Sequence, residues 1–164
     1  MKTHIIRRAL LALGICSALN MQAQAPHPER IYLSGTGTNY TRTWEFYCSK
    51  GQNSGKWKSI EVPSCWELQG FGEYTYGRYY TIKGAKPSDE TGIYRYRFLT
   101  PDCGKTDRVK LFFDGVMTDA EVRVNGNPAG QIHQGAFYRF SYDITSLLKA
   151  EGENLLEAKV AKQS

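Results

Sequence analysis

The feature that most constrains this chain is a two-residue alternation of apolar and polar side chains, which recurs in short runs. The runs cover residues 44–48, 93–99, 109–113, 120–124, 136–144 and 154–162. A period of two is typical of a strand that buries one face. Because Gly, Pro, Asn and Asp separate the runs, the pattern predicts antiparallel strands that are joined by turns.

Turn and helix signals support an all-β fold. Asn125-Gly126 follows one run directly and predicts a tight hairpin. Only residues 143–154 favour a short helical turn, with Asp143 or Thr145 as its cap and Gly152 at its end. Many short strands with frequent turns predict a β-sandwich of the jelly-roll kind.

The first 25 residues have the pattern of a secretory signal peptide. A basic start is followed by an apolar run over residues 9–19 and by small residues at Ala23–Ala25. The run is shorter than the roughly 20 residues of a membrane-spanning helix. We therefore expect residues 1–25 to be removed, residues 26–164 to form the sandwich, and the protein to be secreted or periplasmic. No membrane association is expected after cleavage.

Charge and cysteine content narrow the function classes. Removal of residues 1–25 lowers the net charge from +5 to +2, and no basic block that would indicate nucleic acid remains. Cys48, Cys65 and Cys103 stay in the chain, and they fit either one disulfide with a free thiol or three buried thiols. No Cys or His spacing indicates a metal site, and we expect no cofactor.

Residues 62–80 concentrate aromatic side chains and glycines in a segment without strand or helix periodicity. One interpretation is packing, in which the segment covers the sandwich and each ring is buried. The other is a sugar-binding surface, because aromatic rings stack on the apolar faces of sugars. Composition favours packing.

Five motifs, in order, resemble the N-terminal sugar-binding domain of glycoside hydrolase family 2. That family includes β-galactosidases, β-glucuronidases and β-mannosidases. The resemblance runs from about residue 57 to residue 164, and the ordered set is more specific than any single motif. The motifs are VPSCWELQGFGEYTYG, GIYRYRFLTP, VKLFFDGVMTDAEVRVNGNPAG, HQGAFYRFSYDITSLL and GENLLEAKVAK.

The resemblance implies a galactose-binding-like jelly roll and places the chemistry elsewhere. In the family two glutamates on a later (β/α)₈ barrel act as acid/base and nucleophile, and such a barrel needs roughly 250 residues of its own. We therefore expect no catalytic residue here and no activity of this chain alone. Glu67 and Glu73, beside the aromatic segment, are expected to be solvated or hydrogen-bonded locally. The parent protein would supply immunoglobulin-like and barrel domains and would act on a β-glycoside.

The resemblance also implies contacts to substrate at the rim of the active site. The family contributes such residues from the segment that matches Tyr76 to Tyr80. Arg78, Tyr76, Tyr79 and Trp66 are the predicted substrate-binding residues. β-Galactosidases often carry Asn in this region and this chain does not, which weakens the assignment of a galactoside as substrate.

Three functions therefore follow from the sequence. The first is a non-catalytic domain of a secreted, β-galactosidase-like family 2 enzyme in carbohydrate metabolism. The second is a stand-alone carbohydrate-binding module, since fold does not determine function. The third is a structural or protein-interaction sandwich without sugar contact.

Overall fold

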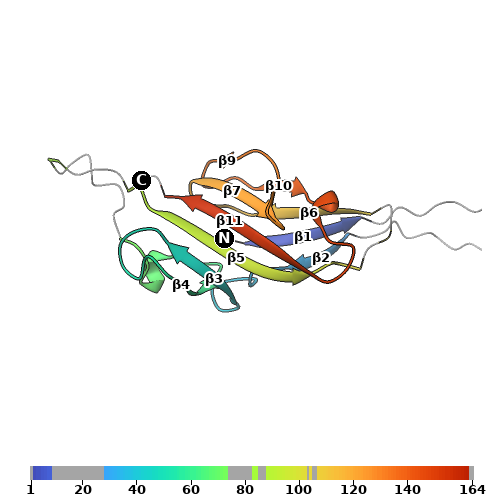
Figure 1. The fold of residues 1–164 in the computed structure, drawn as a ribbon, viewed down its shortest axis with the longest axis horizontal. Coiled ribbons are helices and arrows are strands. Elements are labelled where there is room, and N and C mark those ends of the chain that lie inside the picture. The colour runs from blue at the N-terminus through green and yellow to red at the C-terminus, as the bar shows by residue number, and fades with distance from the viewer. Residues whose placement is uncertain are drawn as a thin grey trace, which may run out of the picture.

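A computed structural model describes residues 2–8, 28–73, 83–84, 88–102, 104 and 107–162, and it is all-β in these parts (Figure 1). Two 3₁₀ turns, η1 (Glu67–Gln69) and η3 (Thr145–Leu147), accompany the strands. The strands are β1 (Thr3–Arg8), β2 (Glu29–Tyr32), β3 (Arg42–Cys48), β4 (Trp57–Val62), β5 (Thr91–Leu99), β6 (Arg108–Phe113), β7 (Asp119–Val124), β8 (Asn127–Pro128), β9 (His133–Gln134), β10 (Phe140–Asp143) and β11 (Glu153–Ala161).

The strands form two antiparallel sheets. The smaller sheet has the order β10-β6-β1-β2, and the larger has the order β4-β3-β5-β11-β7-β8, with β9 paired to β7. The longest pairing joins β11 to β5 over nine residues, from Glu153 opposite Leu99 to Ala161 opposite Thr91. The all-β prediction and its antiparallel pairing are confirmed.

The core lies between the two sheets because β3, β4, β6, β7 and β11 bury every second side chain. In β6 the buried residues are Val109, Leu111 and Phe113, each 0% exposed. In β3 the buried positions again alternate, with Trp44 and Phe46 at most 2% exposed. One cluster contains residues from both sheets, so the alternation in the sequence predicted the inward faces correctly.

Strand β1 is a difference from the sequence prediction. We expected residues 1–25 to lie outside the sandwich, whereas Thr3–Arg8 pairs with β2 on one side and β6 on the other. Thr and Ile are β-branched and favour extended backbone, and Ile5 is 1% exposed in the core. Six residues were too few for their alternation to stand out beside the signal-peptide pattern. Cleavage of the segment stays a prediction.

The predicted Asn-Gly hairpin is confirmed, and the side chain of its asparagine also makes three hydrogen bonds to other parts of the chain. Asn125 and Gly126 have φ values of 52° and 83°, as a tight hairpin requires. The Asn125 amide donates to the Leu147 carbonyl at 2.9 Å and to Asn154 Oδ1 at 2.8 Å, and its oxygen accepts from the Leu155 N–H at 3.0 Å. Asn154 is fully buried. The turn is therefore hydrogen-bonded to η3 and to β11.

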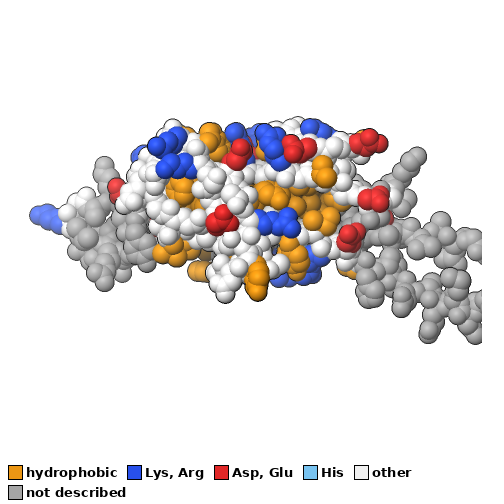
Figure 2. All heavy atoms as spheres, turned by 90° about the horizontal axis from the view of Figure 1, so that it is seen from below, with side chains coloured by type: hydrophobic (Ala, Val, Ile, Leu, Met, Phe, Trp, Pro, Cys, Tyr) orange, Lys and Arg blue, Asp and Glu red, His pale blue; other side chains and the backbone are white. Residues whose placement is uncertain are grey.

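The outer faces are polar and of mixed charge. Arg95 pairs with Glu157 at 2.7 Å and lies 4.0 Å from the centre of the Trp57 ring, and Arg123 pairs with Glu121 at 2.7 Å. Figure 2 shows basic and acidic side chains interspersed with hydrophobic ones on one face. No helix among the described residues is long and apolar enough to cross a membrane.

Candidate functional site

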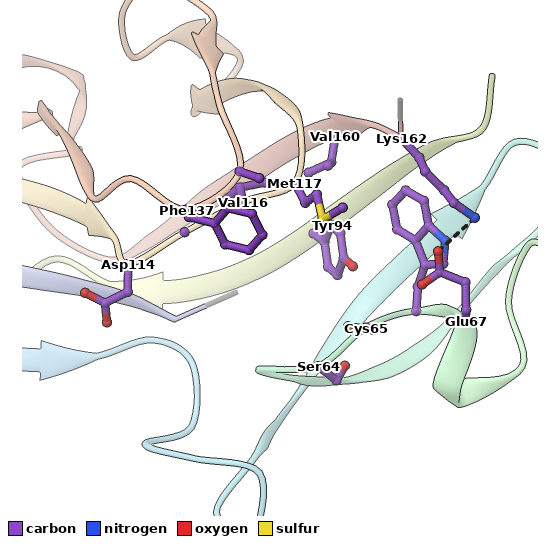
Figure 3. A pocket seen from close by; sticks show the side chains of 13 residues that line it. Ser64, Cys65, Glu67, Tyr94, Asp114, Val116, Met117, Phe137, Val160 and Lys162 are labelled. Atoms are coloured by element: carbon purple, nitrogen blue, oxygen red, sulfur yellow. Dashed lines mark ion pairs between the residues drawn. The ribbon is translucent and has the colours of Figure 1, made fainter. Parts of the chain in front are cut away.

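A pocket of about 360 Å³ opens where five segments meet: the turn after β4, strand β5, the corner between β6 and β7, the loop between β9 and β10, and the end of β11. Its lining comprises Ser64, Cys65, Trp66, Glu67, Tyr94, Asp114, Gly115, Val116, Met117, Ala136, Phe137, Val160 and Lys162. In Figure 3 Asp114 lies at one end and the Glu67–Lys162 ion pair at the other, with Val116, Phe137, Met117 and Tyr94 between them. The volume and the mixed lining are those of a small-ligand site.

The turn after β4 is built from side-chain to backbone hydrogen bonds. The Gln69 amide donates to the Glu61 carbonyl at 2.8 Å, and its oxygen accepts from the Glu61 N–H at 2.9 Å. Gly70 ends η1 with φ of 79°, and its carbonyl accepts from the Asn53 amide at 2.8 Å. These bonds fix the direction in which Trp66 enters the pocket.

Trp66 is a packing residue that also lines the pocket. Its ring lies 5.5 Å from Phe46 and 6.4 Å from Tyr94, and it is 5% exposed. It approaches the backbone of β5 at Gly92, where an added Cβ would lie 2.3 Å from the indole. Its buried Nε1 has no hydrogen-bond partner. The packing interpretation is therefore confirmed for this residue, and contact with a sugar stays a prediction.

Lys162 closes one end of the pocket with a buried pair of carboxylates. Its ammonium lies 2.9 Å from Glu67 Oε1 and 3.3 Å from Glu90 Oε2, and all three side chains are 4–5% exposed. We expected Glu67 to be solvated or bonded locally, which is wrong. The partner is 95 positions away in the sequence, so no local pattern could have shown it. Glu73 is exposed, as expected, and only its backbone joins the cluster.

The Glu67 and Glu90 carboxylates are both engaged by contacts within the chain. Retaining enzymes hold two carboxyl groups about 5–5.5 Å apart with the sugar between them. Here the two carboxylates share one ammonium ion, and Glu90 Oε1 also accepts the Glu73 N–H at 2.6 Å. A Cβ on Gly72 would lie 2.4 Å from Glu90, so backbone covers that carboxylate. Of the two carboxylates, only Glu67 lines the pocket, and it is held by Lys162.

The opposite end of the pocket combines a fixed carboxylate with exposed apolar groups. Asp114 accepts from Nε and Nη2 of Arg139, each at 2.8 Å. Phe137 is 87% exposed and Met117 is 40% exposed. Nothing in the sequence indicates that the segment around Asp114 meets Trp66, because the two residues follow strands of different sheets.

Of the four predicted substrate-binding residues, only Trp66 can be placed. It lines the pocket beside Cys65, which is an exposed free thiol, while Cys48 is a buried free thiol. Tyr76, Arg78, Tyr79 and Cys103 lie outside the described residues. The exposure of Cys65 shows that the three thiols are not all buried.

Comparison with known proteins gives the family. Residues 44–164 match the family described as glycosyl hydrolase 2 galactose-binding domain-like. The chain is 34% identical over 113 residues to a β-galactosidase of Vibrio cholerae, and the aligned region covers 66% of this chain and 11% of that protein. It is 26% identical over 157 residues to a putative β-glucuronidase of Formosa agariphila, and the aligned region covers 92% of this chain and 18% of that protein.

Solved structures agree with this match. An FMN-binding β-glucuronidase from Faecalibacterium prausnitzii superposes with a TM-score of 0.54 at 26% identity, over 74% of this chain and 17% of that one. A Bifidobacterium dentium β-glucuronidase gives a TM-score of 0.53 at 26% identity, over 73% and 19%. The chain thus spans less than a fifth of the length of these relatives. It belongs to the glycosyl hydrolase 2 galactose-binding domain-like family.

Proposed function

We propose that this chain is the non-catalytic sandwich domain of an exported family 2 glycoside hydrolase that acts on a β-galactoside or a related β-glycoside. The observation that carries the proposal is the family match over residues 44–164, together with coverage of only 11–18% of the related enzymes. In this proposal immunoglobulin-like and barrel domains of the same polypeptide supply the remaining parts. Residues 1–25 direct export to the periplasm or the medium.

The carboxylates of the pocket support a non-catalytic role. Glu67 and Glu90 share the ammonium group of Lys162, and Asp114 is paired with Arg139. A general acid must reach a glycosidic oxygen, and a nucleophile must reach the anomeric carbon from the other face. Carboxylates that are held in ion pairs at opposite ends of a pocket cannot meet both requirements at one bond.

The test compares two purified proteins. One is this chain, and the other is the protein extended through the reading frame that follows Ser164. Each is assayed with chromogenic β-galactoside, β-glucuronide and β-mannoside. We expect hydrolysis by the extended protein only, and the preferred substrate identifies the enzyme. Inactivity of both proteins, or the absence of an open frame, contradicts the proposal.

The pocket favours a second candidate function, sugar binding by this domain itself. Trp66, Tyr94 and Phe137 bring aromatic rings to a cavity whose ends carry charged groups, and the Trp66 N–H is an unused donor. Calorimetric titration of the chain with galactose, glucuronate and mannose tests this function. Saturable heat that disappears in Trp66→Phe supports it, because phenylalanine retains an aromatic ring but lacks the donor. No heat with any of the three sugars rejects it.

A further inference from the structure

Strand β1 lies between β2 and β6 and pairs with both; the space that it fills between these two strands is called the slot. On one side Ile5 pairs with Leu111 of β6, and on the other it pairs with Ile31 of β2. The pairing with the β2 side extends to Ser34, whose Oγ accepts the Thr3 N–H at 2.9 Å. Since backbone groups of both neighbours face the slot, only an extended segment can satisfy them.

Two side chains of β1, those of Thr3 and His4, fit this slot less well than the backbone does. Thr3 is 0% exposed and His4 is 2% exposed, yet Thr3 Oγ1 and His4 Nδ1 have no hydrogen-bond partner. They are two of only three buried side-chain atoms without a partner among the described residues. A buried polar group that loses water and gains no partner is destabilising.

The surroundings of these two side chains are mainly apolar or aromatic, and the one carboxylate near them, that of Asp114, lies 4.0 Å from His4 Nδ1, beyond hydrogen-bond distance. The His4 ring stacks on Phe112 at 5.2 Å and lies 5.7 Å from the Tyr32 ring. Thr3 lies opposite the fully buried Phe113 in the register of β1 and β6. Apolar side chains at both positions would fill the same space and leave no atom unpaired.

The start of β1 and the end of β11 lie close together, because both are hydrogen-bonded to residues 114–118. The Asp114 N–H donates to the Lys2 carbonyl at 2.9 Å, where β1 begins, and the Thr118 N–H donates to the Ala161 carbonyl at 3.0 Å, where β11 ends. Four residues of extended chain span at most about 14 Å. A polypeptide that continues from β11 is therefore already beside the start of the slot.

From these observations we infer that the slot between β2 and β6 is the seat of an extended segment from later in the parent polypeptide, with apolar side chains where Thr3 and His4 lie. Thr3–Arg8 holds the slot only in the unprocessed chain. The inference rests on the proposed function, in which residues 1–25 are removed and the protein continues beyond this domain. Removal of the leader would otherwise leave β6 and β2 without the strand that joins them.

The first experiment uses the full chain with a protease site inserted between Ala25 and Pro26. After cleavage, a fluorescent peptide with the sequence of residues 2–8 and its Thr3→Val/His4→Leu version are titrated in, and anisotropy is measured. We expect uptake by the cut chain and not by the uncut chain, with the apolar peptide binding at least tenfold more tightly. A peptide with Ile5→Asp is the control that should not bind. Tighter binding of the native peptide, or no uptake by a folded cut chain, overturns the inference.

A second measurement covers the case in which the cut chain unfolds. Thr3→Val/His4→Leu in the uncut chain should raise the urea midpoint, because both substitutions remove an unpaired buried polar atom. An equal or lower midpoint overturns the inference.

The last arm repeats the peptide titration with the extended protein after cleavage of its leader. Its own strand should exclude both peptides, and uptake would overturn the assignment of the occupant. Hydrolysis is scored separately, so an inactive extended protein that excludes the peptides would reject the proposed activity and leave the strand inference standing.

Discussion

The ammonium group of Lys162 lies 2.9 Å from a carboxylate oxygen of Glu67, and both side chains are only 4% exposed. This pair connects the residue that follows strand β11 to the turn that carries Trp66. With Glu90 as a second carboxylate, the cluster fixes one end of the pocket. Buried charges of this kind are costly unless they are paired, so the cluster should be sensitive to loss of its one cation.

Lys162→Met is expected to lower the free energy of unfolding by about 3–5 kcal/mol, because it removes the ammonium group that both buried carboxylates contact. Urea unfolding followed by tryptophan fluorescence measures the change. Lys159→Met, at an exposed position of the same strand, is the matched control and should change stability by about 0.5 kcal/mol or less. An equal effect of the two substitutions would show that the cluster contributes nothing.

Asn125→Ala is expected to cost about 2–3 kcal/mol. The substitution removes three hydrogen bonds around the buried Asn154, and alanine adopts the positive φ of this turn less readily. Chemical denaturation is the measurement. Asn127→Ala alters an exposed neighbour in the same hairpin and should be close to neutral. If both variants unfold at the same midpoint, the amide network is not what holds the turn.

Phe137→Ala tests sugar binding by the pocket without disturbing the core. The ring is 87% exposed, so its loss should change the free energy of unfolding by about 0.5 kcal/mol or less. If the pocket binds sugar, the same substitution should weaken the sugar affinity several-fold in calorimetry. Tyr138→Ala, which removes an equally large exposed ring outside the pocket lining, should leave the affinity unchanged. Equal losses in the two variants would place the sugar elsewhere.

The stability of the unprocessed chain should depend on pH through His4. Burial lowers the pKa of this imidazole from its ordinary value of 6.5, outweighing the opposing effect of Asp114. Because the folded-state pKa lies below the unfolded-state value, the contribution of His4 is complete above pH 6.5 and is lost as the pH falls. The thermal midpoint should therefore fall between about pH 7 and pH 5 in the native chain, and less so in His4→Leu. Parallel pH profiles would contradict this expectation.

The local sequence pattern predicted most of the fold, because buried and exposed side chains alternate along a strand with a period of two residues. In the alternating runs over residues 93–99 and 120–124, Tyr94, Phe98, Val122 and Val124 lie on the side that is buried. The Asn-Gly hairpin was predicted for a reason equally local, the positive φ of the turn. Trp66 was predicted to be packed or to contact sugar, and it is a buried residue in the wall of the pocket.

The remaining features depend on contacts between distant residues. Nothing near Lys162 in the sequence indicates Glu67 or Glu90, since ion pairs across a fold have no period. The pocket joins Trp66 of one segment to Phe137 of another, and only the packing of the two sheets brings them together. Strand β1 was missed because its six residues lie within a segment whose composition indicates a leader.

The most direct test of the central claim is the rate of β-galactoside hydrolysis by the purified 164-residue chain, measured beside the protein extended past Ser164. The account predicts no hydrolysis above the uncatalysed rate by the chain alone and turnover by the extended protein. Turnover by the chain alone that is lost in Glu67→Gln would contradict it, because the carboxylates described here as structural would then be catalytic.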